Sequence, residues 1–137
     1  MQLYQSDFTT IFLNKRYSLL SQVWQNTGGL TDKIYQNELQ VFTDFVNNHK
    51  VTYILSDIRK LDFPVTPELQ EWTKKSVFGE MEKAGIEKHA IIINTELLSK
   101  LNVVSKEHTL FGFTTQYFDD ATEAREWLNP QLTLQVF

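Results

Sequence analysis

Residues 52–70 read TYILSDIRKLDFPVTPELQ, and this stretch decides the fold class. It opens with the apolar run 52–55, passes through a charged loop and reaches the triplet Thr-Pro-Glu at 66–68. A short apolar run between polar residues is typical of a strand covered on both faces. The triplet offers a helix N-cap, a proline at the first helical position and an acidic first turn. The stretch therefore predicts a central strand, a polar loop and a helix that lasts to about Ala84.

Strand-like and helix-like patterns extend this unit toward the N-terminus. Residues 8–13 and 17–24 are rich in aromatic and β-branched side chains, and the polar residues between them predict a hairpin. Thr31 is then a preferred N-cap, and apolar side chains follow it at alternating steps of four and three. This spacing predicts a helix that runs to about Asn48.

The alternation of strands and helices continues toward the C-terminus. Residues 90–93 are a second unbroken apolar run and predict another central strand. The remaining expected elements are a short helix from 95 to about 101, a strand at 116–118, and a helix that opens with the capping box 120–123 and ends near Pro130. Residues 106–115 and 132–137 show no clear pattern.

The element order predicts an α/β fold. Strands that alternate with helices favour parallel strands joined by right-handed helical crossovers. We therefore expect a mixed sheet, with an N-terminal antiparallel hairpin of two or three strands followed by parallel βαβ units. The chain shows no repeat, low-complexity tract or linker, so residues 1–137 are expected to form a single domain.

Composition and charge exclude several classes of function. The chain has 13 Lys and Arg against 17 Asp and Glu, a net charge of −4, whereas nucleic acids and anionic membranes select clustered basic residues. It has no cysteine, which excludes disulfides, a thiolate nucleophile and cysteine-ligated zinc. The start lacks the pattern of a secretory signal, and no run approaches the roughly 18 apolar residues of a membrane span. We expect a cytoplasmic protein with no transmembrane segment and no nucleic-acid partner.

Motifs for metal, phosphate or nucleophilic chemistry are missing. His49, His89 and His108 lie far apart and form no ligand pair with helical spacing. No Gly-x-Ser-x-Gly elbow is present, and Gly28-Gly29 lacks the signatures of a phosphate-binding loop. The sequence therefore predicts no metal, no cofactor and no catalytic set.

Three segments carry a resemblance to a known family. They are YILSDIRKLDF at 53–63, the glycine and apolar strand at 85–93, and YFDDATEAREWL at 117–128. Together they resemble the SpoIIAA-like branch of the STAS superfamily, the sulfate-transporter and anti-sigma-antagonist domains. The resemblance implies a mixed sheet with helices mainly on one face. It also implies that the loop before the second long helix meets partners.

Thr66 has two interpretations. In anti-sigma antagonists this loop carries a serine whose phosphorylation switches partner binding, and the resemblance places Thr66 at that position. The family's Asp-Ser-Ser-Gly pattern is replaced here, however, and Pro67 removes an amide that could receive a phosphate. The other interpretation is a plain helix N-cap, which cap preference favours.

Charged residues gather in the loop after the strand at 52–55. Asp57, Arg59 and Asp62 follow the end of a predicted parallel strand, where open α/β sheets usually bind ligands. They could form the polar mouth of a binding site. Alternatively, Asp57 pins the loop and Arg59 forms a solvated ion pair.

The predicted helix 66–84 carries three further candidate residues. A helical wheel places Glu80 inside its apolar stripe, where a carboxylate could act as an acid or base, although a slight rotation would release it to solvent. Trp72 and Phe78 lie on opposite margins of the stripe and are expected to be half exposed. This placement has two interpretations of equal weight. Trp72 and Phe78 could border an apolar groove or an oligomer contact, or they could belong to a broad core that neighbouring loops cover.

These residues leave three functional hypotheses. The leading one is a non-enzymatic STAS-like binding or regulatory module that recognises a protein partner through loop 57–67 and the following helix. The second is a carrier of a small apolar or lipid-like ligand beneath the helices, which resemblance to STAS and CRAL-TRIO type domains allows. The third is an enzyme that uses Glu80 or Asp57 as acid or base. A cavity beside Trp72 and Phe78 would indicate a carrier, and a flat apolar patch an adaptor.

Overall fold

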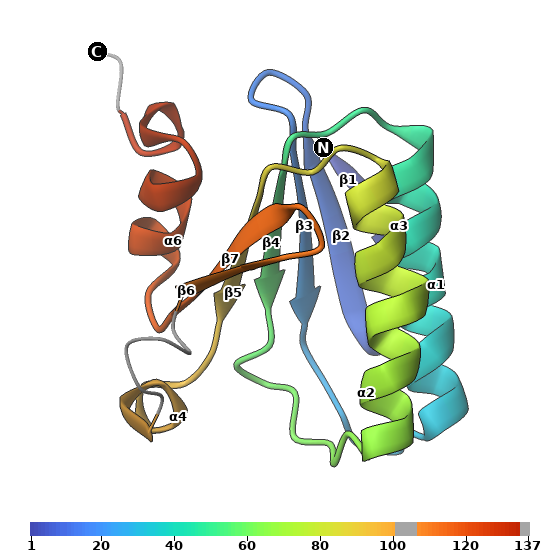
Figure 1. The fold of residues 1–137 in the computed structure, drawn as a ribbon. Helices are drawn as coiled ribbons and strands as arrows, with labels where there is room; N and C mark the ends of the chain where they lie inside the picture. The colour runs from blue at the N-terminus through green and yellow to red at the C-terminus, as the bar shows by residue number, and fades with distance from the viewer. Residues whose placement is uncertain (101–106, 135–137) are drawn as a thin grey trace.

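A mixed β-sheet runs through the centre of the molecule (Figure 1). The computed structural model describes residues 1–100 and 107–134. Within these residues, the seven strands of the sheet lie in the order β1-β2-β3-β4-β5-β7-β6. Their bounds are β1 Gln2–Gln5, β2 Thr9–Asn14, β3 Leu19–Trp24, β4 Tyr53–Asp57, β5 Lys88–Ile92, β6 Glu107–Leu110 and β7 Phe113–Phe118.

The pairing of the strands confirms the predicted fold class. β1, β2 and β3 are antiparallel, as are β6 and β7, whereas β3, β4, β5 and β7 pair in parallel. The predicted hairpin is β2–β3, and β1 extends it from the polar first residues. The predicted last strand is β7, which is longer than expected and forms a second hairpin with β6 in the region that had no clear pattern.

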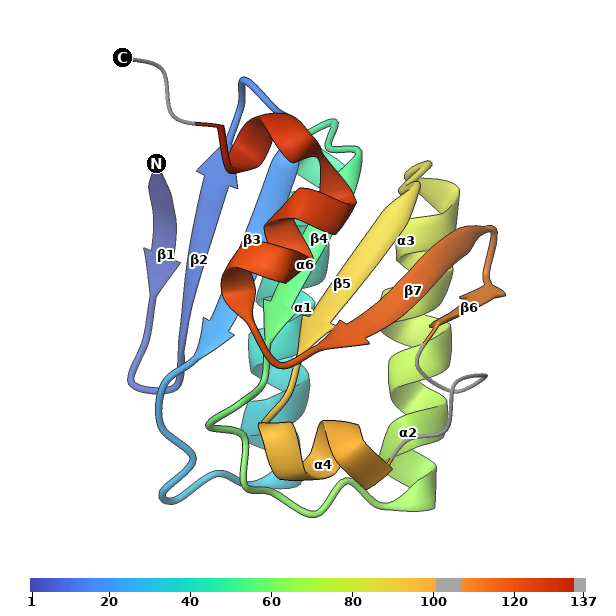
Figure 2. The same ribbon diagram turned by 90° about the vertical axis from the view of Figure 1, so that its left-hand side faces the viewer.

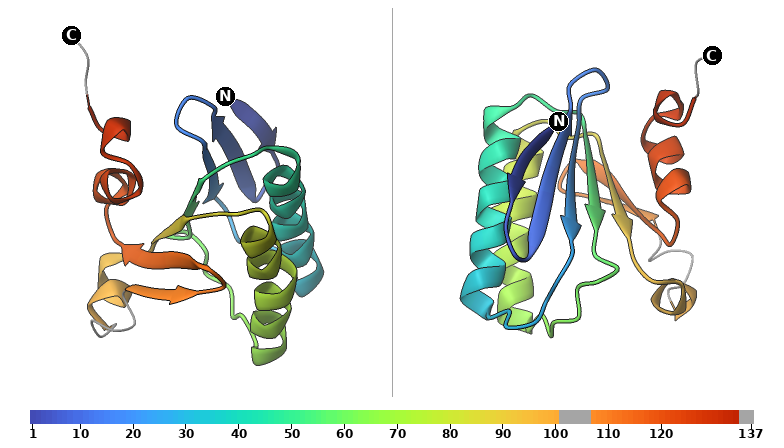
Figure 3. Two further views of the ribbon diagram at one scale, coloured as in Figure 1. Left: turned by 45° about the horizontal axis from the view of Figure 1, so that its top comes forward. Right: turned by 180° about the vertical axis from the view of Figure 1, so that it is seen from behind.

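Two long helices cover one face of the sheet and a shorter helix covers the other (Figures 2 and 3). The long helices are α1 Asp32–Asn48 and a continuous helix made of α2 Pro67–Thr73, the π-helical turn η1 Lys74–Phe78 and α3 Gly79–Lys83. The shorter helix is α6 Ala121–Leu128, which is followed by the 3-10 turn η2 Pro130–Leu132. α4 Thr95–Lys100 lies beyond the carboxyl end of β5, and Leu101 of the helix predicted there lies outside the described residues.

The helices begin where the sequence predicts. The side chain of Thr31 accepts a hydrogen bond from the Ile34 amide, and Asp120 accepts one from the Glu123 amide. Each bond satisfies one of the amides that a helix N-terminus leaves without an intrahelical partner. α1 and α6 therefore start at their predicted caps.

The central strands are buried on both faces, as their apolar runs predict. Along β4, Ile54 points toward α1 and the long helix, whereas Leu55 belongs to the apolar cluster beneath α6. On the α6 side, the ammonium of Lys88 donates to the Trp127 carbonyl at 2.9 Å and lies 4.8 Å from the centre of that indole ring. This contact holds the end of α6 against β5.

The π-helical turn changes the expected burial of the long helix. A wheel drawn with one uniform helical period places Ala84 on the apolar stripe, but Ala84 is exposed. The wider turn at Lys74–Phe78 shifts the angular position of every later residue relative to that wheel. Val77 and Met81 remain buried, and Trp72 and Phe78 are both half-buried, as predicted.

Candidate functional site

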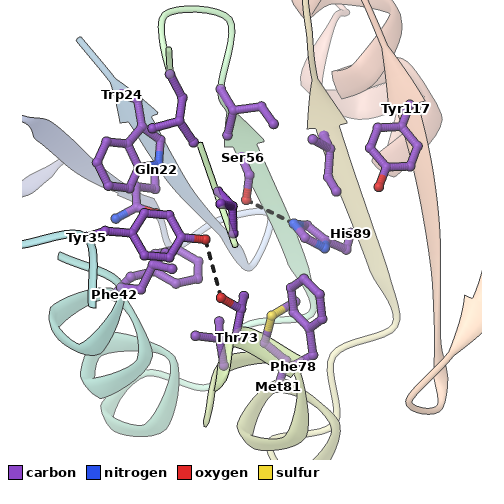
Figure 4. Close-up of a pocket in the computed structure, with 16 residues that line it drawn as sticks. Gln22, Trp24, Tyr35, Phe42, Ser56, Thr73, Phe78, Met81, His89 and Tyr117 are labelled. Carbon is purple, nitrogen blue, oxygen red and sulfur yellow. Dashed lines mark hydrogen bonds between the residues drawn. The ribbon is translucent and has the colours of Figure 1, made fainter. Parts of the chain in front are cut away.

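A cavity of about 230 Å³ lies between the sheet and the two long helices (Figure 4). It sits toward the carboxyl ends of the parallel strands, the usual position of ligand sites in open α/β sheets. β3, β4, β5 and β7 form its floor, and α1, the long helix and the loop 58–65 form its other walls. The lining residues are Gln22, Trp24, Tyr35, Leu39, Phe42, Ser56, Ile58, Leu61, Val65, Thr73, Val77, Phe78, Met81, His89, Ile91 and Tyr117.

The floor of the cavity contains a row of residues in register across four strands. Gln22 pairs with Ser56, Ser56 with Ile91, and Ile91 with Tyr117. Because side chains alternate between the two faces of a strand, all four members point to the same side. Three of them are polar, so the floor differs from the apolar walls around it.

Ser56 forms a hydrogen-bonded pair with His89 at the centre of this floor. The serine Oγ lies 2.9 Å from the histidine Nε2 (Figure 4). His89 is 3% exposed and its ring makes edge contacts with Phe78 at 5.8 Å and Phe113 at 6.1 Å between ring centres. The pair is therefore a polar centre held in place by aromatic rings.

The side of the cavity next to β3 is aromatic. Trp24 stacks on Tyr35 with ring centres 5.8 Å apart, and Tyr35 stacks on Phe63 at 5.7 Å. The Tyr35 hydroxyl lies 3.3 Å from the Thr73 hydroxyl of the long helix. Burial raises the pKa of Tyr35 above its ordinary value near 10, and the contact with Thr73 opposes this only in part. The phenol is therefore a neutral hydrogen-bonding group at physiological pH.

This raised pKa predicts an alkaline loss of stability. A raised pKa means that the folded state disfavours the phenolate, so the stabilisation from neutral Tyr35 is complete below about pH 10 and is lost as pH rises further. We expect Tyr35→Phe to reduce the drop in urea midpoint between about pH 9 and about pH 11. Tyr4 and Tyr117 also have pKa values raised by burial, so part of the drop should remain. Equal drops in both proteins would contradict this expectation.

The loop 58–65 has an apolar inner side and a charged outer side. Ile58, Leu61 and Val65 line the cavity, whereas Arg59 is exposed. The amide of Ile58 donates to the Ile92 carbonyl at 2.9 Å and thereby fixes the start of the loop on β5. The loop is consequently a wall of the cavity and part of the surface at once.

The candidate residues Asp57 and Arg59 pair with each other outside the cavity. The Arg59 guanidinium contacts the Asp57 carboxylate at 3.0 Å through Nε and at 2.6 Å through Nη2. These bonds, with a smaller contribution from nearby Asp120, raise the pKa of Arg59 above its ordinary value. Asp57 points to the same side of β4 as Leu55, because the two residues are two positions apart, so its carboxylate lies on the α6 side of the sheet.

Asp62 and Thr66 lie on the surface of the same loop. Asp62 is exposed, and its carbonyl accepts a hydrogen bond from the Thr27 hydroxyl at 3.4 Å. The Thr66 hydroxyl accepts a hydrogen bond from the Leu69 amide at 3.3 Å, so it caps α2. Neither residue lines the cavity.

The three candidates on the long helix occupy different surroundings. Phe78 lines the cavity and also a neighbouring hollow of about 190 Å³ beside Phe111. Trp72 lies in a shallow surface hollow with Pro67, Glu68, Glu71 and Lys75. Glu80 is half-buried, does not line the cavity, and forms an ion pair with Lys83 at 3.6 Å. Of the seven candidates, the structure therefore brings only Phe78 to the cavity.

Sequence reasoning missed the polar residues of the cavity floor. Gln22, Ser56 and His89 are polar residues at strand positions that point to the helix side of the sheet. The nearest positions on the same side of their strands are apolar, namely Leu20 and Trp24 in β3, Ile54 in β4 and Ile91 in β5. A buried polar side chain in such a position needs a hydrogen-bonding partner, which makes it unusual in a core strand. That interruption of an apolar strand face, combined with strand alternation, was the available signal.

Comparison with known proteins adds a family to this geometry. The SpoIIAA-like family model matches residues 24–129, which include β4, β5, β7 and both long helices but only the last residue of β3. The chain belongs to the SpoIIAA-like family. The resemblance carried by segments 53–63, 85–93 and 117–128 is thereby confirmed, and this STAS-type family consists of non-enzymatic regulatory and binding modules.

Further comparisons give no relative for this SpoIIAA-like chain. Neither the curated proteins nor the solved structures contain a significant match to it.

Among the described residues, no group of three or more His, Asp or Glu side chains is arranged to hold a metal ion. In the same part of the chain, no helix is long and apolar enough to cross a membrane.

Proposed function

We propose that this SpoIIAA-like module binds a small, largely apolar molecule in the cavity beneath its two long helices. The observation that carries the proposal is the cavity itself, because its lining of mainly apolar and aromatic side chains with a few polar groups is the usual lining of small-molecule sites. At about 230 Å³ it exceeds an apolar cavity of about 150 Å³ that is sufficient to bind benzene. A cavity beside Phe78 favours the carrier hypothesis over an adaptor that uses a flat apolar patch.

The loop 57–67 could couple binding in the cavity to recognition of a protein partner, because it has one side in the cavity and one side on the surface. Its inner residues Ile58 and Leu61 line the cavity, and its outer residue Arg59 is fixed by Asp57 on the surface. An occupant that contacts the inner side would stabilise one loop conformation and hence one arrangement of the surface charges. In the proposal, the bound molecule regulates recognition of a protein partner through this loop.

A second candidate function rests on Trp72. Its half-buried indole lies in the shallow hollow between Glu71 and Lys75, outside the cavity. Aromatic side chains with polar neighbours are enriched at protein interfaces. Direct docking of a protein at the start of the long helix would use this surface whether or not the cavity is occupied.

Filling the cavity with a side chain tests the proposal. Val77 lines the cavity, whereas Val46 is buried in the same core without lining it. We expect Val77→Phe to abolish the chemical-shift changes that ethylbenzene causes in the wild-type NMR spectrum, because the new ring occupies the space. Its cost in unfolding free energy should stay below that of the matched control Val46→Phe, which overpacks a filled core by about 1–3 kcal/mol.

Two results would contradict the proposal. One is an absence of ethylbenzene binding to the wild-type protein at concentrations near its solubility. The other is retention of ethylbenzene binding in Val77→Phe, which would place the probe elsewhere. Val46→Phe should retain binding as long as the protein is folded, as judged by its amide spectrum.

A further inference from the structure

The polar floor of the cavity restricts the chemistry of its occupant. We infer that the molecule bound is a neutral compound of one or two aromatic rings that carries one hydrogen-bonding group, with Ser56 and His89 as its anchor. This inference rests on the proposed function and names the class of ligand. It is carried by the size of the cavity, the residues that line it, and the Ser56–His89 pair.

Size sets the upper limit of the ligand. The cavity is about one and a half times as large as one that accommodates benzene, at about 230 Å³ against about 150 Å³. A cavity of this size can hold one aromatic ring with a short substituent, or two fused rings. A long acyl chain would extend outside this volume, and drug-sized ligands generally occupy pockets of about 300–1,000 Å³.

Charge on the ligand is disfavoured by the lining. None of the sixteen described residues around the cavity is Lys, Arg, Asp or Glu. A cation taken from water into such a site finds no carboxylate, and an anion finds no Lys or Arg but only the imidazole of His89, which is 3% exposed, so the lost hydration costs several kcal/mol. Burial also raises the pKa values of Tyr35 and Tyr117, so both phenols on the lining stay neutral at physiological pH.

Aromatic shape is favoured by the walls. Trp24, Tyr35, Phe42 and Phe78 contribute four rings to the lining, from two helices and one strand. Offset stacking or edge contacts between rings add to the gain from burying apolar area. A flat ligand can use both contacts between the rigid sheet and the helices.

The anchor is the Ser56–His89 pair. A serine hydroxyl has one donor and two acceptor positions, and the 2.9 Å bond to His89 Nε2 uses one of these three. Ser56 is half-buried at the centre of the floor, so its remaining capacity is directed to a group inside the cavity. A ligand hydroxyl or N–H placed there is compensated for its lost hydration, whereas against the apolar side chains of the walls it is not.

A thermodynamic cycle with matched probes tests this anchor. The probes are 4-ethylphenol, ethylbenzene and 4-ethylbenzoate, which share size and differ in polarity and charge. The variants are Ser56→Ala and the control Ser21→Ala, the same change at a buried serine of β3, which precedes Gln22 by one residue and therefore points to the face of the sheet away from the cavity. Kd is measured by NMR titration, and Ser56→Thr tests rescue by a retained hydroxyl.

The expected result is a change in preference that is specific to Ser56. In Ser56→Ala, Kd for 4-ethylphenol should rise about tenfold relative to Kd for ethylbenzene, a change of about 1.4 kcal/mol. Ser21→Ala and Ser56→Thr should keep the wild-type ratio to within about twofold. A further comparison uses the wild-type protein alone and so does not depend on the folding of any variant. In this protein, 4-ethylbenzoate should bind at least about tenfold more weakly than 4-ethylphenol.

The failures of the anchor and of the proposed function are distinguishable. An unchanged ratio in Ser56→Ala, with ethylbenzene still bound, overturns the anchor and leaves the cavity as a binding site. Wild-type binding of 4-ethylbenzoate as tight as that of 4-ethylphenol overturns the neutral class of ligand. Failure of all three probes to bind the wild-type protein overturns both the inference and the proposed function.

Discussion

Glu38→Ala should lower the free energy of unfolding by about 3 kcal/mol or more, because it removes the acceptor shared by three hydroxyl groups. Glu38 is 5% exposed on the inner side of α1. Its carboxylate accepts hydrogen bonds from Tyr4 at 2.8 Å and Thr9 at 2.9 Å, and from Ser6. The truncation leaves these donors near the core without their partner and weakens the attachment of β1 to α1.

Urea denaturation measures this loss, and Glu71→Ala is the matched control. Glu71 carries the same side chain on α2, is 59% exposed and forms a 4.0 Å ion pair with Lys74. Its removal should cost less than about 0.5 kcal/mol, as is usual for exposed ion pairs. Similar losses in the two variants would show that the hydroxyl cluster around Glu38 does not hold the N-terminal strand.

The second large effect is expected at Phe78. Phe78→Ala should lower the unfolding free energy by about 2–3 kcal/mol, since the ring contacts His89, Phe111 and Phe113 and a large side chain removed from a core leaves a void. It should also join the main cavity to the hollow of about 190 Å³ on the other side of the ring. The enlarged space should then accept probes longer than ethylbenzene, such as butylbenzene.

Trp72→Ala is the comparison for Phe78→Ala. Trp72 lies outside the cavity in the surface hollow, so its loss should cost about 1 kcal/mol or less and leave ethylbenzene binding unchanged. Equal effects of the two truncations on probe binding would contradict the assignment of only Phe78 to the cavity. Loss of a protein partner in Trp72→Ala alone would instead support the second candidate function.

Local signals predicted the framework of the fold. The N-caps Thr31, Thr66 and Asp120 fix where helices begin, because each has a side-chain oxygen that accepts an amide hydrogen bond within the first turn. The apolar run at 52–55 predicted β4, whose residues face two apolar clusters. Such features depend on neighbours close in sequence, and the mixed sheet follows from their order.

The cavity depends on contacts between residues that are far apart in the sequence, and the pattern of a single segment does not predict such contacts. Ser56 and His89 meet only because β4 and β5 pair in parallel with Ile54 opposite His89. The π-helical turn that ends at Phe78 is wider than an α-helical turn, and no residue type in the sequence predicts it. Glu38 lies on the inner side of α1, three residues after Tyr35, yet its hydroxyl partners come from the first strands.

The placement of the charged candidates follows from the same alternation. A loop rich in charge at the end of a strand predicts a polar site, but Asp57 is one residue beyond Ser56 and points to the opposite face. One step in strand position therefore separates the surface pair Asp57–Arg59 from the polar floor of the cavity. In the proposed function, loop 57–67 connects these two sides.

The central claim is that a small apolar molecule binds between the sheet and the long helices, and intermolecular NOEs test it most directly. The probe is ethylbenzene bound to the wild-type protein with labelled methyl groups. The account predicts NOEs from the probe to the methyl groups of Met81, Leu39 and Ile91, which line the cavity from α3, α1 and β5. NOEs confined to the surface around Trp72, or to residues between α6 and the sheet such as Leu128 of α6, would contradict it.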